Sequence, residues 1–196
     1  MNNLSLSRSL MRRLAMVAVL AAMTGCASVK MPAPAPSAAN AEKLRATKLA
    51  PAQVGNFTLA AGKPATMDTS LSGLRGSTLS PTNGSFSSQL RDEIAAELTA
   101  AGLLDPKSNA VIQGQLTDSM IDAAIGTGKG RLAAKIQVQR NGKTVYDKEV
   151  VAEATWESSF IGAVAIPLAM NQYGALYKTL VGKLFDDADF KRALAP

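Results

Sequence analysis

The fold is decided by the stretch Arg131-Leu132-Ala133-Ala134-Lys135-Ile136-Gln137-Val138-Gln139-Arg140-Asn141-Gly142-Lys143-Thr144-Val145-Tyr146. Its first part alternates apolar side chains with polar or charged ones, which is typical of a strand with one buried face. Asn141-Gly142 is a strong hairpin signal. A second strand over residues 144–156 follows, with apolar residues such as Tyr146 and Trp156 on one side and mainly acidic residues on the other. We therefore expect a long antiparallel hairpin.

The register of this hairpin can be tested by side-chain parity. A simple two-residue loop would pair Val138 with Val145 and would place Asp147 on the buried face. One extra residue pairs Val138 with Tyr146 instead, which restores the apolar face. We therefore predict a bulged turn around Gly142 and not a simple two-residue one.

An amphipathic helix is predicted to begin near Ser85. Its apolar residues recur at every fourth position: Phe86, Leu90, Ile94 and Leu98. The charged residues Arg91, Asp92, Glu93 and Glu97 lie off that stripe. Gly102 supplies the stop, since a glycine just after a helix readily adopts the left-handed conformation.

Two further strands flank this helix, one over 54–59 and one over 110–120 with Leu116 and Met120 on the same side. A helix between two strands favours a parallel pair. A second helix is predicted from an apolar stripe that begins at Tyr173 and ends at Phe185. The fold class is therefore α+β, as a single domain over 51–196. It has a mixed sheet of about four strands, with two main helices packed on one face.

Two glycine-containing segments are interpreted as connections. Residues 62–85 have little period and read as a long loop, which Leu71, Leu74 and Leu79 attach to the core. Residues 126–130, Gly-Thr-Gly-Lys-Gly, lack the spacing of a phosphate-binding loop and are interpreted as a flexible turn between strands.

The most apolar segment after Cys26 runs from Phe160 to Ile166. The continuous apolar core over 160–170 is about half as long as a bilayer-spanning helix must be, and Pro167 lies in its middle, so we expect a buried crossing followed by a helix with Pro167 in its first turn. The alternative is a contact with lipid or a partner. The residues of that alternative are Phe160, Ile161, Val164 and Ile166 for apolar groups, with Lys129, Arg131 and Lys135 for phosphates.

The first 25 residues have the order of a secretory signal peptide: Arg8, Arg12 and Arg13, then an apolar run of about ten residues, then small residues. Met23-Thr24-Gly25-Cys26 resembles a bacterial lipobox, in which the cysteine is acylated. Residues 26–50 then read as an acylated cysteine and a Pro/Ala-rich tether. About ten extended Pro/Ala residues at roughly 3.1 Å each would hold the domain about 30 Å from a membrane. Ala27 in the next position implies, by this resemblance, passage to the outer membrane.

Composition excludes several kinds of chemistry. Histidine is absent and Cys26 is the only cysteine, so disulfides, Ser-His-Asp and Cys-His machinery and His-ligated zinc are excluded. Three of the 21 basic residues precede Cys26, which leaves 18 against 15 acidic ones. That excess of about three charges is too small to indicate nucleic acid.

No cofactor or metal site is expected. The run of Asp186, Asp187 and Asp189 lacks the glycine and the distal glutamate of a calcium loop. It is interpreted as a cap for a short helix over 190–194.

The order of strand, helix ending at Gly102, antiparallel strands and C-terminal helix resembles small envelope lipoproteins of Gram-negative bacteria. These include the YajG-like group and the periplasmic domain of curli-secretion lipoproteins. We expect a lipid-anchored, non-catalytic binding or accessory module in envelope assembly or transport, at the outer membrane and facing the periplasm. Its expected partner is another envelope protein or lipid. The alternatives are a lipid- or lipopolysaccharide-binding module and a carboxylate-based envelope hydrolase.

Overall fold

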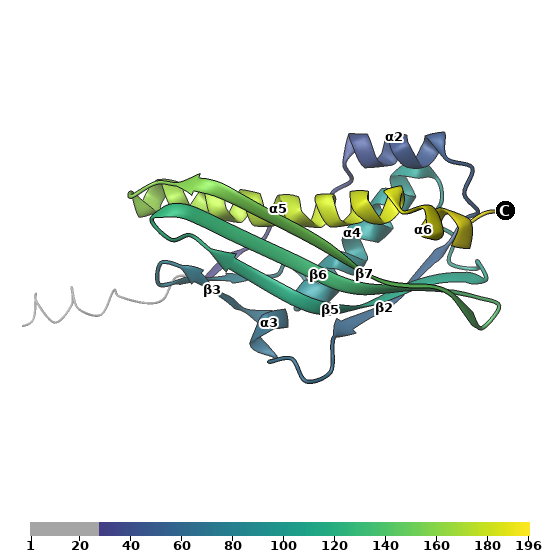
Figure 1. Ribbon diagram of the computed structural model, residues 1–196, viewed down its shortest axis with the longest axis horizontal. Coiled ribbons are helices and arrows are strands. Elements are labelled where there is room, and N and C mark those ends of the chain that lie inside the picture. The colour runs from purple at the N-terminus through teal and green to yellow at the C-terminus, as the bar shows by residue number, and fades with distance from the viewer. Residues whose placement is uncertain (1–27) are drawn as a thin grey trace, which may run out of the picture.

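The computed structural model describes residues 28–196. Its main sheet has the strand order β2-β5-β6-β7, with β2 parallel to β5 and the other neighbours antiparallel (Figure 1). The strands are β2 (Gln53–Leu59), β5 (Ala110–Asp122), β6 (Gly126–Arg140) and β7 (Lys143–Ser158). The expected α+β fold with a mixed four-stranded sheet is confirmed.

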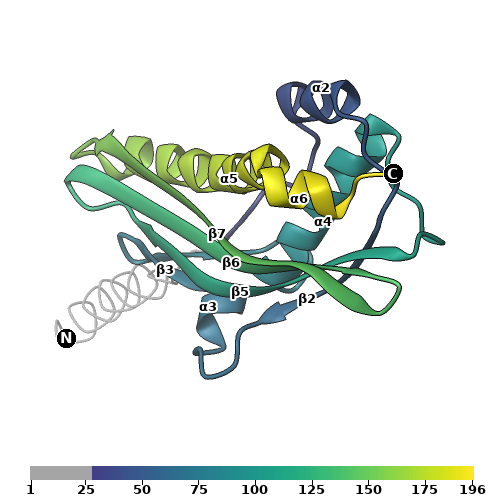
Figure 2. The same ribbon diagram turned by 45° about the vertical axis from the view of Figure 1, so that its right-hand side comes forward.

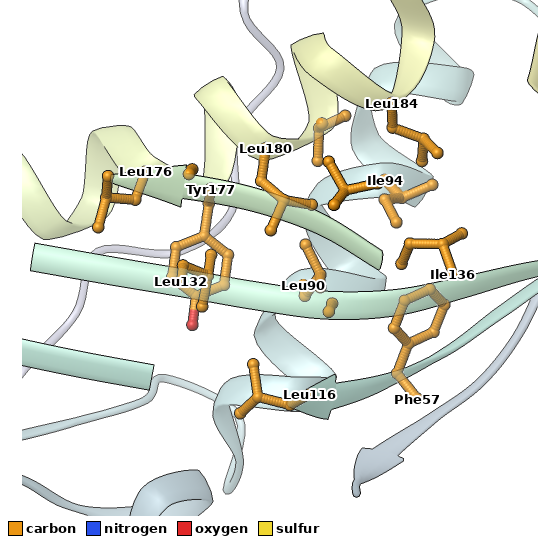
Figure 3. Close-up of a cluster of buried hydrophobic side chains, with 14 of the residues drawn as sticks. Phe57, Leu90, Ile94, Leu116, Leu132, Ile136, Leu176, Tyr177, Leu180 and Leu184 are labelled. Carbon is orange, nitrogen blue, oxygen red and sulfur yellow. The ribbon is translucent and has the colours of Figure 1, made fainter. Parts of the chain in front are cut away.

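Two long helices, α4 (Phe86–Ala101) and α5 (Gly162–Asp186), pack on one face of this sheet, which we call the inner face. Figure 3 shows Leu90 of α4 and Leu180 of α5 meeting Leu132 and Ile136 of β6. All four side chains are fully buried. The predicted caps of α4 are also present: Ser85 accepts a hydrogen bond from the Ser88 N–H, and Gly102 has φ +74°.

The β6–β7 hairpin has the predicted pairing of Val138 with Tyr146, but the predicted turn is wrong in detail. Asn141 and Gly142 form a two-residue turn with φ angles of 52° and 75°. Such positive angles are what a tight hairpin turn requires of both central residues. The extra residue is taken up three positions later, where the register shifts beside the half-exposed Val145.

A second bulge lies in β5, where the register shifts between Leu116 and Asp118. The expectation that Met120 faces inward is therefore wrong, because one extra residue reverses the side of every residue beyond it. Ser119 is buried in its place, and its hydroxyl lies 2.6 Å from the Tyr173 hydroxyl of α5.

Residues 126–130 are not a flexible turn but the first residues of β6. Gly128 makes room for the indole ring of Trp156 on the neighbouring strand, and a Cβ added at Gly130 would lie 3.0 Å from Leu176 Cδ1 of α5. A Cβ added at Gly128 would lie 2.2 Å from Trp156 Nε1. The glycines are thus required by packing, a requirement that the local sequence does not show.

The segment over 62–85 is more ordered than a loop. It contains α3 (Thr66–Thr69), β3 (Leu71–Leu74) and β4 (Ser77–Ser80), and β1 (Ser28–Lys30) completes a small sheet of order β1-β4-β3. The expectation that its leucines reach the core is confirmed, since Leu71, Leu74 and Leu79 are all buried.

The predicted signal peptide and Cys26 lie outside the described residues. The expected tether after Cys26 is wrong from Ser28 onward, because the chain packs on the domain. Ser28 pairs with Thr78, Met31 is buried, and helix α2 (Ala38–Ala46) follows. No extended tether is left in this part of the chain to supply the expected spacing of about 30 Å.

Helix α5 begins at Gly162, so Pro167 lies in its second turn and not in the first as expected. A short helix, α6 (Ala188–Ala193), ends the chain. The predicted capping role of the acidic run is confirmed at Asp187, whose carboxylate accepts hydrogen bonds from the N–H groups of Asp189 and Phe190.

Candidate functional site

One end of the molecule carries four exposed apolar side chains, which we call the apolar tip. They are Ile125, Phe160, Ile161 and Val164, with exposed fractions of 64%, 79%, 60% and 54%. The pairing of Gly126 with Ser158 brings the β5–β6 turn and the β7–α5 connection to the same end of the sheet (Figures 1 and 2).

The expectation of a buried crossing over 160–166 is therefore wrong for most of its length. At the end of the inner face, the space between sheet and helix is already filled by Trp156 and by Ala165 and Ala169 of α5. Residues 160–164 lie beyond this filled space. Only Ile166 of the four predicted contact residues is partly buried, where it packs against the core.

Arg75 attaches the β3–β4 turn to the tip. Its guanidinium donates to the carbonyl oxygens of Ala123 at 2.7 Å, Phe160 at 2.9 Å and Ser159 at 2.5 Å. It also donates to the Ser158 hydroxyl at 3.2 Å. Such charge-assisted bonds to several acceptors fix both tip connections to the small sheet. Nothing in the sequence around Arg75 indicates this role, since its partners lie about 50 and 85 residues away.

Two of the three predicted cations, Arg131 and Lys135, are engaged in ion pairs. Arg131 forms ion pairs with Asp118 at 2.8 Å and with Glu153, and Lys135 forms one with Asp147 at 3.2 Å. These residues lie on the outer face of the sheet, opposite the helices. Lys129 forms no ion pair within residues 28–196, and its neighbours on the adjacent strands are Asp122 and Thr155. Of the residues predicted to contact lipid, Phe160, Ile161 and Val164 are exposed, whereas Arg131 and Lys135 already have carboxylate partners.

A second candidate is a pocket of about 300 Å³ between α4, α5 and the segment 31–37. We call the segment 31–37 the strap. Its lining includes Met31, Pro32, Glu93, Tyr177 and Lys178. Gln89 donates from its side-chain amide to the Pro32 carbonyl oxygen at 3.0 Å, which holds the strap over the pocket. The space is therefore closed on one side by the chain's own N-terminal segment.

The carboxylates of Glu93 and Glu97 lie beneath the strap, although both residues were predicted to lie outside the apolar stripe of their helix. Glu93 is 3% exposed and Glu97 is fully buried. Glu97 Oε1 accepts from the Ser37 N–H at 2.8 Å and from the Asn40 side-chain amide at 3.1 Å. That amide also donates to the Lys178 carbonyl oxygen at 3.1 Å. The sequence could not show this burial, because the covering segment lies about 60 residues earlier.

The environment of Glu93 raises the pKa of its carboxyl from 4.5 to about 7. Burial is the largest cause and the Glu97 carboxylate adds to it, whereas the Lys178 charge and the Ala35 N–H act in the opposite direction. One oxygen of each carboxylate has no hydrogen-bond partner within the described residues. A carboxyl with a perturbed pKa beside a pocket is a recognised signature of functional sites, and also of structural networks.

Within residues 28–196, no group of three metal-ligating side chains is close enough to hold a metal ion. None of the helices in the same residues has both the length and the apolar character that crossing a membrane requires.

Comparison with known proteins gives a fold and no family. No protein-family model matches the sequence, and no curated protein matches it. Among solved structures, the chain is similar to a Xanthomonas campestris protein described by the family DUF330, with TM-score 0.53 and 12% identity. The match covers 81% of this chain and 95% of that one. This similarity supports the fold alone.

Two further solved structures are similar at lower scores. A Chlamydia trachomatis protein described as hypothetical matches with TM-score 0.42 and 11% identity, over 70% of this chain and 96% of that one. A minor lipoprotein from Acinetobacter baumannii matches with TM-score 0.37 and 13% identity, over 72% and 89%. Scores this low carry no argument about function.

Proposed function

We propose that this chain is a lipoprotein of the bacterial envelope, anchored through acylated Cys26 at the outer membrane and facing the periplasm. In this proposal it is a non-catalytic binding or accessory module in envelope assembly or transport. The observation that carries the proposal is the tetrapeptide Met23-Thr24-Gly25-Cys26 at the end of a signal-like segment, two residues before the domain begins at Ser28. Two or three long acyl chains make attachment effectively permanent.

The non-catalytic part of the proposal is supported by the way the buried carboxylates are used. A glycosidase needs two carboxylates that flank one bond at a separation of about 5–10 Å. Glu93 and Glu97 are neighbours on α4, but only Glu93 lines the pocket. Glu97 is committed to the strap through Ser37 and Asn40. The two cannot act on the same ligand while the strap is in place.

A lipid-binding module is the second candidate, and the exposure of Phe160 favours it. The ion pairs of Arg131 and Lys135 oppose its phosphate-binding half, because these cations already have carboxylate partners. We therefore retain the apolar contact and drop the proposed lipopolysaccharide phosphate site.

The test is the intact mass of the protein isolated from membranes, beside a Cys26→Ser variant, with fractionation of both. The proposal expects acyl mass on Cys26 and a smaller membrane-bound fraction for the variant than for the parent protein. Circular dichroism of the variant serves as the folding control. Protein without acyl mass on Cys26, or a folded variant that is membrane-bound to the same extent as the parent protein, would overturn the anchor. With the anchor established, crosslinking in intact cells would identify the envelope partner.

A further inference from the structure

We infer that the apolar tip is a second membrane contact, which inserts Ile125, Phe160, Ile161 and Val164 into the bilayer that holds the acyl chains of Cys26. This inference rests on the proposed anchor. It changes the picture of the domain from one held away from the membrane to one that lies directly against it. No described segment of the chain covers these side chains, which are all more than half exposed.

The position of the anchor selects lipid as the occupant of the tip. Cys26 precedes Ser28 by two residues, and an extended chain spans at most about 3.6 Å per residue, so Cys26 lies within about 7 Å of Ser28. Ser28 pairs with Thr78 in the small sheet, and β4 begins only two residues after Arg75. Arg75 in turn binds the backbone of the tip at Ser159 and Phe160. The acyl chains and the tip therefore emerge from the same end of the molecule.

The two views of the ribbon agree with this placement. In both, the purple β1 segment and β3 lie toward the end where the β5–β6 turn and the start of α5 project (Figures 1 and 2). The turn of the β6–β7 hairpin, at Asn141 and Gly142, points away from that region. An anchor at β1 thus brings the tip, and not the Asn141 turn, toward the bilayer.

The tip is also held in a fixed arrangement. Arg75 donates hydrogen bonds to Ala123 in the β5–β6 connection and to Phe160 in the β7–α5 connection. Both connections of the tip are therefore attached to the β3–β4 turn, and β4 pairs with β1. Side chains presented on a fixed backbone lose little conformational entropy on insertion. This favours stable contact once the acyl chains have brought the surface close.

The charges around the tip point to apolar insertion without a requirement for anionic lipid. Lys129 lies opposite Asp122, and Thr127 lies opposite Glu157, so charges of both signs surround the tip. The Arg75 guanidinium is engaged with backbone oxygens. Binding should therefore be similar, within about threefold, for zwitterionic and anionic vesicles, because the charges around the tip are of both signs and largely offset one another.

The first experiment uses the acylated full-length protein in phosphatidylcholine vesicles. A fluorescent label is placed at Phe160→Cys and, as a matched control, at Val145→Cys, an exposed apolar position at the other end of the same hairpin. Nitroxide lipids should quench the label at 160 at least threefold more strongly than the label at 145. Equal, weak quenching would overturn the inference while leaving the anchor intact.

The second experiment removes the anchor and isolates the tip. The Cys26→Ser protein is sedimented with phosphatidylcholine vesicles, alone and with Phe160→Ser plus Ile161→Ser, or with the control Val145→Ser. The double substitution should lower the partition coefficient about tenfold, because two large apolar side chains lose their burial. The control should change it by less than twofold. Equal binding of all three proteins would overturn the inference.

The outcomes separate the two proposals. Missing acyl mass would overturn the anchor. Sedimentation of the Cys26→Ser protein with vesicles would still test whether the tip binds lipid without the anchor. If the label at 160 is already in an apolar environment without vesicles, and the protein has the mass of a dimer, the tip is an interface between copies and the inference fails.

Discussion

The apolar tip and the strap region depart from the usual distribution of side chains in opposite ways. At the tip, large apolar residues such as Phe160 are exposed, and under the strap the carboxylates of Glu93 and Glu97 are buried. The strap carboxylates are covered by the chain itself, and Glu97 finds its partners there. The tip has no cover within the described chain. The comparison teaches that the buried carboxylate of Glu97 attaches one part of the chain to another, while the exposed apolar end is available to something outside the domain.

The largest expected effect comes from breaking the strap attachment. Glu97→Ala leaves the Ser37 N–H and the Asn40 amide without an acceptor, so it should lower the free energy of unfolding by about 3–4 kcal/mol. Urea denaturation measures this loss, and limited proteolysis should show cleavage within residues 31–37. Glu97→Gln is the control, since its carbonyl oxygen can still accept both bonds. An equally large loss in that variant would contradict the assigned role.

The next effect is a pH dependence from Glu93. Its carboxyl has a folded-state pKa of about 7 against an ordinary 4.5, so between these values the folded state keeps a proton that the unfolded state has released. Stability should therefore fall as the pH rises from 4.5 to 7 and should level off above. The loss is about 3 kcal/mol in total, at about 1.4 kcal/mol per pKa unit.

Glu93→Gln isolates this contribution, because the amide does not titrate. The variant should be more stable than the parent protein at pH 8 and should show a flatter profile between pH 4.5 and 7. Urea unfolding at a series of pH values measures both. An unchanged slope in the variant would show that Glu93 ionises normally under the strap.

A smaller loss in the free energy of unfolding is expected when the attachment of the apolar tip is broken. Arg75→Ala removes four hydrogen bonds, but the freed carbonyl oxygens are close enough to solvent to recover some of them, so we expect a loss of about 2 kcal/mol. The control Lys148→Ala breaks ion pairs with Asp187 and Asp189 on the surface and should cost less than about 1 kcal/mol. Hydrogen exchange at residues 159–162 should accelerate only in the Arg75 variant.

The smallest change in the free energy of unfolding is expected for a substitution at the exposed tip itself. Phe160→Ser should change the free energy of unfolding by less than about 0.5 kcal/mol, because the ring is 79% exposed and makes little contact within the domain. Thermal or urea unfolding of the isolated protein measures it. A loss above about 1 kcal/mol would indicate that the ring is packed in solution, and the tip would then be part of the core.

Local patterns in the sequence determined most of the fold. The alternation along 131–138 predicted β6, the stripe from Phe86 to Leu98 predicted α4, and the parity argument found the pairing of Val138 with Tyr146. These predictions succeeded because strand and helix periods are set by backbone geometry, which neighbouring residues express directly. The lipobox resemblance at Cys26 is also local, and it still awaits its test.

The tertiary structure decided everything that depends on distant partners. Arg75 donates hydrogen bonds to residues 48 and 85 positions away. Glu97 is bonded to Ser37 and Asn40, which lie about 60 residues earlier. Gly128 leaves room for the indole ring of Trp156. The single inserted residue in β5 turned Met120 outward and Ser119 inward. The same holds for Phe160: its apolar sequence predicted burial, but the space at that end of the sheet was already filled. Hydrophobicity states a preference for burial, and only the packed chain determines whether there is room.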